Sequence, residues 1–371
     1  MNKKLISLLS TAALAVSMLT VPAFAAEGGE ADAALDKTNE VVVTLGDTVT
    51  ASTVEDTDKA AADKTAADKT ETADSAPAAS TEKKQITYVA LGDSIVAGVG
   101  LADVKYTNDS TTLYSVDMSP NFKGYSPDCY VGKVATMMGL DRDHAINLGL
   151  PALTAPDLVD MVRDGQMPKM NMESGCWYKY PEFQDYIRKA DVVSVQIGSN
   201  DAFVPCIVAL GNATNWKSEA LAASVLAGDL RASGSPASAL IQGIKDMHLT
   251  RDERNATWNL LTSEMSKICD RIYPQTTAAL ISVVQEIRKL NPDCQILLMG
   301  YTDPVPFIPC WHNYFKKLNK FEKQLAETYD LTYVAIPKAK TDLDVHPTIS
   351  GHEYIAKKIV NSIELPEDSA Q

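Results

Sequence analysis

Basic residues are in the minority in this chain. Its 371 residues include 34 Lys and Arg against 48 Asp and Glu, which gives a formal net charge of −14. Proteins that bind nucleic acids need clustered Lys and Arg to neutralise phosphates, so this balance argues against a nucleic-acid-binding protein. The same deficit argues against tight docking on an anionic membrane surface. We expect no nucleic-acid partner.

The sequence also lacks the usual cysteine motifs. No two of its six cysteines follow the Cys-x-x-Cys spacing that zinc ribbons and thioredoxin-like proteins use. An even number of cysteines permits up to three disulfides in an exported chain, and free buried thiols are the alternative. The six residues are Cys129, Cys176, Cys206, Cys269, Cys294 and Cys310.

Two further absences exclude specific classes of protein. No Gly-x-Ser-x-Gly elbow occurs anywhere, which excludes the usual α/β-hydrolase assignment. Beyond the N-terminus, no stretch reaches the ~18–20 apolar residues that a membrane-spanning helix needs. We therefore expect no stable insertion into a membrane.

The first 25 residues have the pattern of a secretory signal peptide. Lys3 and Lys4 form a charged start, and an apolar run extends from Leu5 to about Val21. Ala23-Phe24-Ala25 then places small residues at the −3 and −1 positions of a cleavage site. This pattern predicts a secreted protein, free or loosely associated with the cell surface.

Residues 26–84 predict a disordered low-complexity linker. The segment is rich in Ala, Asp, Lys, Thr and Ser, and repeats Ala-Ala-Asp-Lys-Thr at 61–65 and 66–70. Its second half has almost no large apolar side chains, so it cannot bury enough surface to offset the entropy of ordering.

From Gln85 onward the pattern changes to that of an α/β domain. Apolar runs predict strands at 86–91, 143–149, 192–197, 294–299 and 331–336. Helical periodicity lies between and after them, at 128–139, 155–163, 180–189, 260–290, 311–328 and 350–362. This alternation predicts a parallel sheet with helices on both faces. Residues from about 202 to 259 break the alternation and predict a helical insertion, a candidate lid or specificity cap.

Polar residues gather at the predicted carboxyl ends of three strands. Ser94 follows the first strand, Asn200 follows the third, and His346 follows the fifth. Ligands of parallel α/β sheets bind beyond this edge, so these side chains are expected to converge. A serine, a histidine and a neutral amide donor are suited to acyl transfer.

These blocks resemble the SGNH (GDSL-type) hydrolases. The similar segments are 88–94 (YVALGDS), 147–152 (NLGLPA), 198–201 (GSND) and 344–347 (DVHP), and the resemblance extends over about 86–362. It implies a flavodoxin-like three-layer α/β/α sandwich with a five-stranded parallel sheet over 85–371. It also implies ester hydrolysis without a metal or an organic cofactor.

The resemblance assigns roles to individual residues. It implies Ser94 as the nucleophile and His346 as the base that accepts its proton. The oxyanion hole would use the backbone N–H of Ser94, the Asn200 side chain and a backbone N–H of the second block, from Ala152 or Gly149. Asp344 is the favoured residue to orient His346.

Two positions depart from the family pattern. Ala152 stands where the family usually has glycine, and alanine resists a positive φ. Leu343 stands three residues before His346, where the family has its aspartate. Asp344, Asp342 or a backbone carbonyl would then orient the imidazole.

Three functions follow from these observations. The first is an exported serine esterase for acetyl or other short-acyl esters, including esters of carbohydrates. The second is a lipase or phospholipase of the same family with the insertion as its lid. The third is a non-catalytic surface-binding protein on a hydrolase fold. The expected partner is therefore a small-molecule, polysaccharide or lipid ester.

Overall fold

The computed structural model describes residues 85–104, 106–107, 115–116, 122–171, 177–221, 236–304, 306, 308–342 and 346–364. The predicted signal peptide (1–25), the predicted linker (26–84) and Asp344 lie outside these ranges. Within them, no helix is long and apolar enough to cross a membrane.

The main sheet has five strands that are parallel throughout. They are β1 (Tyr88–Gly92), β4 (Ala145–Gly149), β5 (Val192–Gln196), β6 (Gln295–Met299) and β7 (Thr332–Val334). Their spatial order is β4-β1-β5-β6-β7, and every neighbouring pair is parallel. This is the flavodoxin-like order, in which the second strand lies outside the first. The predicted five-stranded parallel sheet is confirmed.

Alternation along the central strands divides the core in two. In β1, Val89 and Leu91 face one hydrophobic cluster, while Tyr88 and Ala90 face the other. Successive side chains of a strand point to opposite faces, so a strand covered on both sides must be apolar at every position. All five residues of β1 are buried, as this requires.

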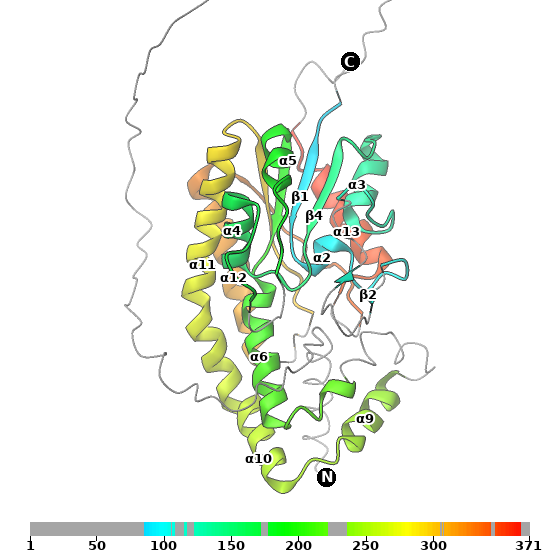
Figure 1. Cartoon of the computed structure of the whole chain (residues 1–371), viewed down its shortest axis with the longest axis vertical. Coiled ribbons are helices and arrows are strands. Elements are labelled where there is room, and N and C mark those ends of the chain that lie inside the picture. The colour runs from blue at the N-terminus through cyan, green and yellow to red at the C-terminus, as the bar shows by residue number, and fades with distance from the viewer. Residues whose placement is uncertain are drawn as a thin grey trace, which may run out of the picture. The chain divides into compact units, whose positions relative to one another are not determined.

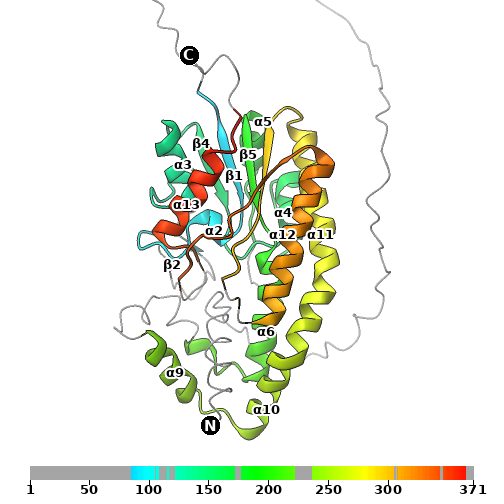
Figure 2. The same cartoon turned by 180° about the vertical axis from the view of Figure 1, so that it is seen from behind.

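Helices cover both faces of the sheet and complete the three layers (Figure 1). The helices α3 (Tyr130–Met138) and α13 (Ile349–Val360) pack on one face. The opposite face carries α4 (Ala155–Asp164), α5 (Phe183–Lys189), α11 (Met265–Leu290) and α12 (Pro309–Tyr329). Figure 2 shows the same layers from behind. The predicted α/β/α sandwich is therefore confirmed.

The region predicted as an insertion is largely helical among its described residues, and three of its helices have both ends in the described part of the chain. They are α6 (Ser199–Ala213), α9 (Pro236–Asp246) and α10 (Arg251–Asn259). A π-helical turn at Leu260–Glu264 leads from α10 directly into α11. Two short segments, β2 (Tyr106–Thr107) and β3 (Ser115–Val116), form a separate antiparallel pair that the sequence did not predict.

The cysteines of the described region are free thiols. Five are buried and unbridged, which favours the second of the two alternatives that the sequence left open. Cys176 lies outside the described residues. The five free thiols are Cys129, Cys206, Cys269, Cys294 and Cys310.

Candidate active site

The turn after β1 places Ser94 at the carboxyl edge of the sheet. Ser94 begins the short helix α2 (Ser94–Ala97), and the Asp93 carboxylate caps it by accepting the Ile95 N–H at 2.9 Å. Gly92 is required just before this cap, because a Cβ atom there would lie 2.0 Å from the Gln196 carbonyl oxygen. The strand can therefore pass β5 closely and still expose the serine beyond its end.

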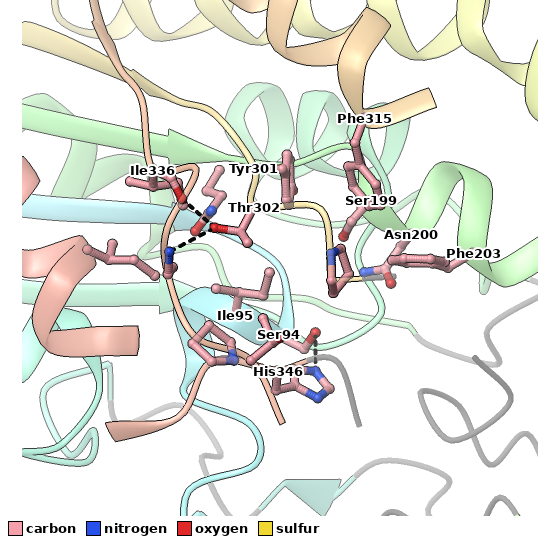
Figure 3. Close-up of a pocket in the computed structure, with 16 residues that line it drawn as sticks. Ser94, Ile95, Ser199, Asn200, Phe203, Tyr301, Thr302, Phe315, Ile336 and His346 are labelled. Atoms are coloured by element: carbon pink, nitrogen blue, oxygen red, sulfur yellow. Dashed lines mark hydrogen bonds between the residues drawn. The ribbon is translucent and has the colours of Figure 1, made fainter. Parts of the chain in front are cut away.

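Ser94 and His346 are in direct contact. The Oγ of Ser94 lies 2.9 Å from Nε2 of His346, within hydrogen-bonding distance (Figure 3). The loop that carries the buried His346 is closed by a backbone hydrogen bond, because the Asp342 N–H donates to the His346 carbonyl at 2.9 Å. At this distance an imidazole can accept the hydroxyl proton as the serine attacks.

A turn at residues 150–153 brings the second block to the same place. The Leu150 N–H donates to the Gly92 carbonyl at 2.9 Å, which ties the turn to the strand that leads to Ser94. On its other side, Nδ2 of Asn200 donates to the Leu153 carbonyl at 3.0 Å. Ala152, within this turn, therefore lies between the segments that carry Ser94 and Asn200.

Three donors at this place are available to a ligand. Among the described residues, none accepts a hydrogen bond from the backbone N–H of Ser94 or of Ala152. The second amide hydrogen of Asn200 likewise has no acceptor in the described part of the chain. Unpaired N–H groups are rare at buried positions, and Ala152 is only 2% exposed. Such donors suit the negative oxygen of a tetrahedral intermediate.

The alternative donor, Gly149, is already occupied. Its N–H donates to Oδ1 of the buried Asn147 at 2.9 Å. The absence of a side chain at Gly149 serves packing, because a Cβ atom there would lie 2.3 Å from the Ala97 nitrogen. The Gly149 N–H is therefore already paired within the fold, whereas no described residue accepts the Ala152 N–H.

The residue that orients His346 stays a prediction. Asp344 lies outside the described residues. Asp342 is described, and its backbone N–H is bonded to the His346 carbonyl. The role assigned to Asp344 therefore rests on the sequence.

Asp93 is the centre of a buried network that the sequence analysis missed. Its Oδ2 accepts the Ser199 hydroxyl at 2.7 Å and the Tyr301 hydroxyl at 3.1 Å. Burial raises the pKa of this carboxyl, and the hydrogen bonds from Ser199, Ile95 and Tyr301 oppose that rise. The network joins the ends of β1, β5 and β6 and fixes the turn that holds Ser94. Its only sequence signals are Ser199, inside the Gly-Ser-Asn-Asp block, and Tyr301, just beyond a predicted strand.

A narrow cavity opens beside the Ser94–His346 pair. Apolar side chains form much of its wall, and Figure 3 shows several of them around Ser94. The space open to the centre of a water molecule is about 30 Å³, which is room for about two waters. Within the described ranges, no group of three or more His, Cys, Asp or Glu could hold a metal ion. The apolar wall includes Ile95, Phe203, Phe315, Ile336 and Ile355.

Asp201, next to Asn200, anchors the start of α4. Its carboxylate accepts the Ala155 N–H at 2.9 Å and the Thr276 hydroxyl at 3.0 Å. Burial is the largest influence and raises the pKa of Asp201 to about 7. The folded protein therefore binds this proton more tightly than the unfolded chain does.

This shift predicts that Asp201 lowers stability as the pH rises. Below the unfolded-state pKa of about 4, the carboxyl is protonated in both the folded and the unfolded state, and its contribution to stability is fully present. As the pH rises through 7, this contribution is lost, and the free energy of unfolding falls by on the order of 4 kcal/mol in total. Asp201→Asn keeps an uncharged amide in place, so its free energy of unfolding should rise relative to wild type between pH 4 and 8. Urea titrations of both proteins across this range measure the difference.

Asp201→Asn must be compared with wild type at each pH, because another buried group changes the free energy of unfolding with pH in the opposite direction. Burial lowers the pKa of His352 to about 3, so its contribution to folding is lost as the pH falls below 6.5. His352 is common to both proteins and cancels in the difference. A difference that stays constant from pH 4 to 8 would contradict the assignment to Asp201.

The strand order and the residues at the carboxyl edge of the sheet define a class. A serine, an asparagine and a histidine that follow β1, β5 and β7 are the arrangement of SGNH-type α/β/α hydrolases. Residues 90–354 match the GDSL-like Lipase/Acylhydrolase family, and the chain belongs to this family. The protein is a carboxylic ester hydrolase.

Similar solved structures include enzymes named as lipases and esterases. A lipase from a goat rumen metagenome shares 14% sequence identity at a TM-score of 0.42, over 75% of this chain and 97% of that chain. Phospholipase A1 from Streptomyces albidoflavus also shares 14% identity at a TM-score of 0.42, over 75% and 100%. A carbohydrate acetylesterase from Sinorhizobium meliloti shares 13% at 0.39, over 74% and 97%. No curated protein matches the chain significantly.

Proposed function

We propose that the protein is an exported serine esterase that removes acetyl or other short acyl groups. The observation that carries this proposal is the 2.9 Å contact between Ser94 Oγ and His346 Nε2, beside N–H donors that no described residue accepts. A nucleophile, a base and an oxyanion site within one edge of the sheet are the minimum that acyl transfer needs.

In the proposed reaction, Ser94 Oγ attacks the carbonyl carbon of the ester while His346 Nε2 accepts the hydroxyl proton. The carbonyl oxygen becomes negative and binds the N–H groups of Ser94 and Ala152 and the amide of Asn200. Collapse of this intermediate expels the alcohol, which takes the proton from His346. Water then attacks the acyl-enzyme and gives a proton to His346, which passes this proton to Ser94 Oγ as the acid leaves.

The size of the cavity favours a short acyl group. Room for about two water-sized groups beside Ser94 suits the methyl and carbonyl of an acetyl ester. The apolar wall suits a methyl group and offers little to a charged one. The alcohol would lie toward solvent, where a sugar ring is a suitable leaving group.

Export is proposed from the first 25 residues alone. The charged start, the apolar run and the small residues at Ala23 and Ala25 fit a signal peptide. An exported esterase would meet ester-bearing polysaccharides or small molecules outside the cell, free in solution or loosely attached to the cell surface.

A series of p-nitrophenyl esters from two to sixteen carbons tests the proposed substrate class. We expect kcat/KM to be highest for the acetate or propionate and to fall by at least about 100-fold by eight carbons, because methylenes that extend beyond the narrow cavity would gain no apolar contact there. An optimum at eight carbons or more would instead identify the lipase.

The mechanism is tested separately with a fluorophosphonate probe. We expect labelling of the native protein at Ser94, located by mass spectrometry of the modified peptide, and no labelling after heat denaturation. Labelling requires an activated serine, so an unlabelled native protein without esterase activity would support the non-catalytic binding protein.

A further inference from the structure

The turn that carries Ala152 has an unusual backbone. Leu153 N–H donates to the Leu150 carbonyl at 3.2 Å, so residues 150–153 form a β-turn with Pro151 and Ala152 as its central pair. Ala152 has a φ of 61°. Proline at the second position and a positive φ at the third are the marks of a type II turn, which normally has glycine at the third position.

Alanine favours the alternative turn. Types I and II differ mainly by rotation of the central peptide, here the one that joins Pro151 to Ala152, and type I gives the third residue a negative φ. The left-handed conformation is unfavourable for a residue with a Cβ atom. Without a further constraint, Ala152 would therefore favour the rotated peptide.

Rotation of this peptide would move the oxyanion donor. The peptide unit is planar and trans, so the Pro151 carbonyl and the Ala152 N–H point in opposite directions. Whatever holds the carbonyl on one side also aims the N–H at the other. A rotated peptide would point the N–H of Ala152 away from the position it now occupies and put a carbonyl oxygen there, which would repel an oxyanion.

Tyr178 holds this carbonyl. Its hydroxyl donates to the Pro151 oxygen at 2.8 Å in a buried environment. The tyrosine is itself fixed: its carbonyl accepts the Met167 N–H at 3.0 Å, and its ring stacks on Tyr180 with centroids 6.1 Å apart. The segment returns from the far end of α4, the helix that begins directly after the turn.

We infer that Tyr178 is a positioning residue that keeps the Pro151–Ala152 peptide in the orientation that presents the Ala152 N–H to the oxyanion. This inference rests on the proposed function, because it requires Ala152 to be an oxyanion donor. The hydroxyl compensates for alanine at a position where glycine would adopt the turn without strain. A hydrogen bond to the carbonyl also polarises the peptide and strengthens its N–H as a donor.

A double-mutant cycle tests this inference with p-nitrophenyl acetate as substrate. Tyr178→Phe should lower kcat by about 5- to 30-fold and change KM less than about twofold. The strain of alanine in the left-handed conformation would then shift the turn toward the rotated peptide by about this factor. In an Ala152→Gly background, the same tyrosine substitution should lower kcat by only about twofold, because glycine tolerates both φ signs. Losses in this background are measured against Ala152→Gly itself, which keeps the backbone N–H at position 152.

Tyr125→Phe is the matched control. The Tyr125 hydroxyl is buried and donates to the Ala145 carbonyl at 2.9 Å, at the opposite end of β4 from the site. Its removal should lower the free energy of unfolding as Tyr178→Phe does, but leave kcat within twofold. An equal loss of kcat from Tyr178→Phe with alanine or glycine at 152, or no loss in either, would overturn the inference.

Failure of the proposed function would look different. In that case Ser94→Ala would retain activity, and the fluorophosphonate probe would not label Ser94. The cycle is therefore interpreted only on an activity that Ser94→Ala abolishes. A Tyr178→Phe protein with an unfolding midpoint near that of Tyr125→Phe shows that its loss of kcat does not come from misfolding.

Discussion

Ser94→Ala is expected to lower kcat/KM for p-nitrophenyl acetate by about 10⁴- to 10⁶-fold, the range seen when a catalytic nucleophile is removed. The substitution deletes the Oγ that lies 2.9 Å from His346 and leaves no atom to form the acyl-enzyme. The N–H donors beside it remain, so a residual rate above that of water is compatible with the proposal. Initial rates of purified wild-type and variant proteins measure the loss.

Ser282→Ala is a suitable control for this loss. Ser282 lies on α11, and its hydroxyl donates to the Ala278 carbonyl one turn earlier in the same helix at 3.1 Å. It removes the same hydroxyl from a partly buried helical position and should leave kcat/KM within twofold. More than about 1% of wild-type activity in Ser94→Ala, with a normal circular dichroism spectrum, would mean that another residue is the nucleophile.

The sequence predicted the sheet and the convergence of Ser94, Asn200 and His346 for one physical reason. Parallel strands buried on both faces must be apolar along their length, so each is visible as a short run that ends in polar residues. Because the carboxyl ends of parallel strands share one edge, residues that follow different strands are brought together. Ser94 and His346 are 252 positions apart and still meet.

Details that depend on long-range contacts were not predictable in this way. The sequence showed that Ala152 resists a positive φ, but not that the hydroxyl of Tyr178, 27 positions from Pro151, would hold the peptide. Whether the Ala152 or the Gly149 N–H is open to a ligand depended on Asn147, because its side-chain oxygen accepts the Gly149 N–H. Neither tyrosine nor asparagine carries a local signal for such a role.

Buried charge illustrates the same limit. Glu322 lies in the middle of α12 and is fully buried, with no hydrogen-bond partner for either oxygen among the described residues. Burial raises the pKa of Glu322 well above its ordinary value. In the sequence, a glutamate among Lys, Asn and Gln predicts an exposed helix face. Only the packing of α12 against the sheet shows otherwise.

Asn200→Ala is expected to lower kcat by about 10²- to 10³-fold with a small change in KM, because the amide acts on an oxygen that becomes negative only in the transition state. Asn200 lies in the first turn of α6, where one amide hydrogen is bonded to the Leu153 carbonyl and the other is available. A donor that bound substrate and transition state equally would affect KM instead. Steady-state kinetics with acetate esters separates the two constants.

Asn291→Ala separates this effect from the general cost of losing a buried amide. Nδ2 of Asn291 donates to the carbonyls of Ile187 and Ala190 at 2.9 and 2.7 Å, at the amino-terminal end of β6 and far along the sheet from Ser94. Both variants should lose stability, since each leaves buried carbonyls without a donor. Only Asn200→Ala should lose kcat. An Asn200→Ala protein that keeps kcat and raises KM would assign the amide to substrate binding, and the oxyanion would then depend on the N–H groups of Ser94 and Ala152 alone.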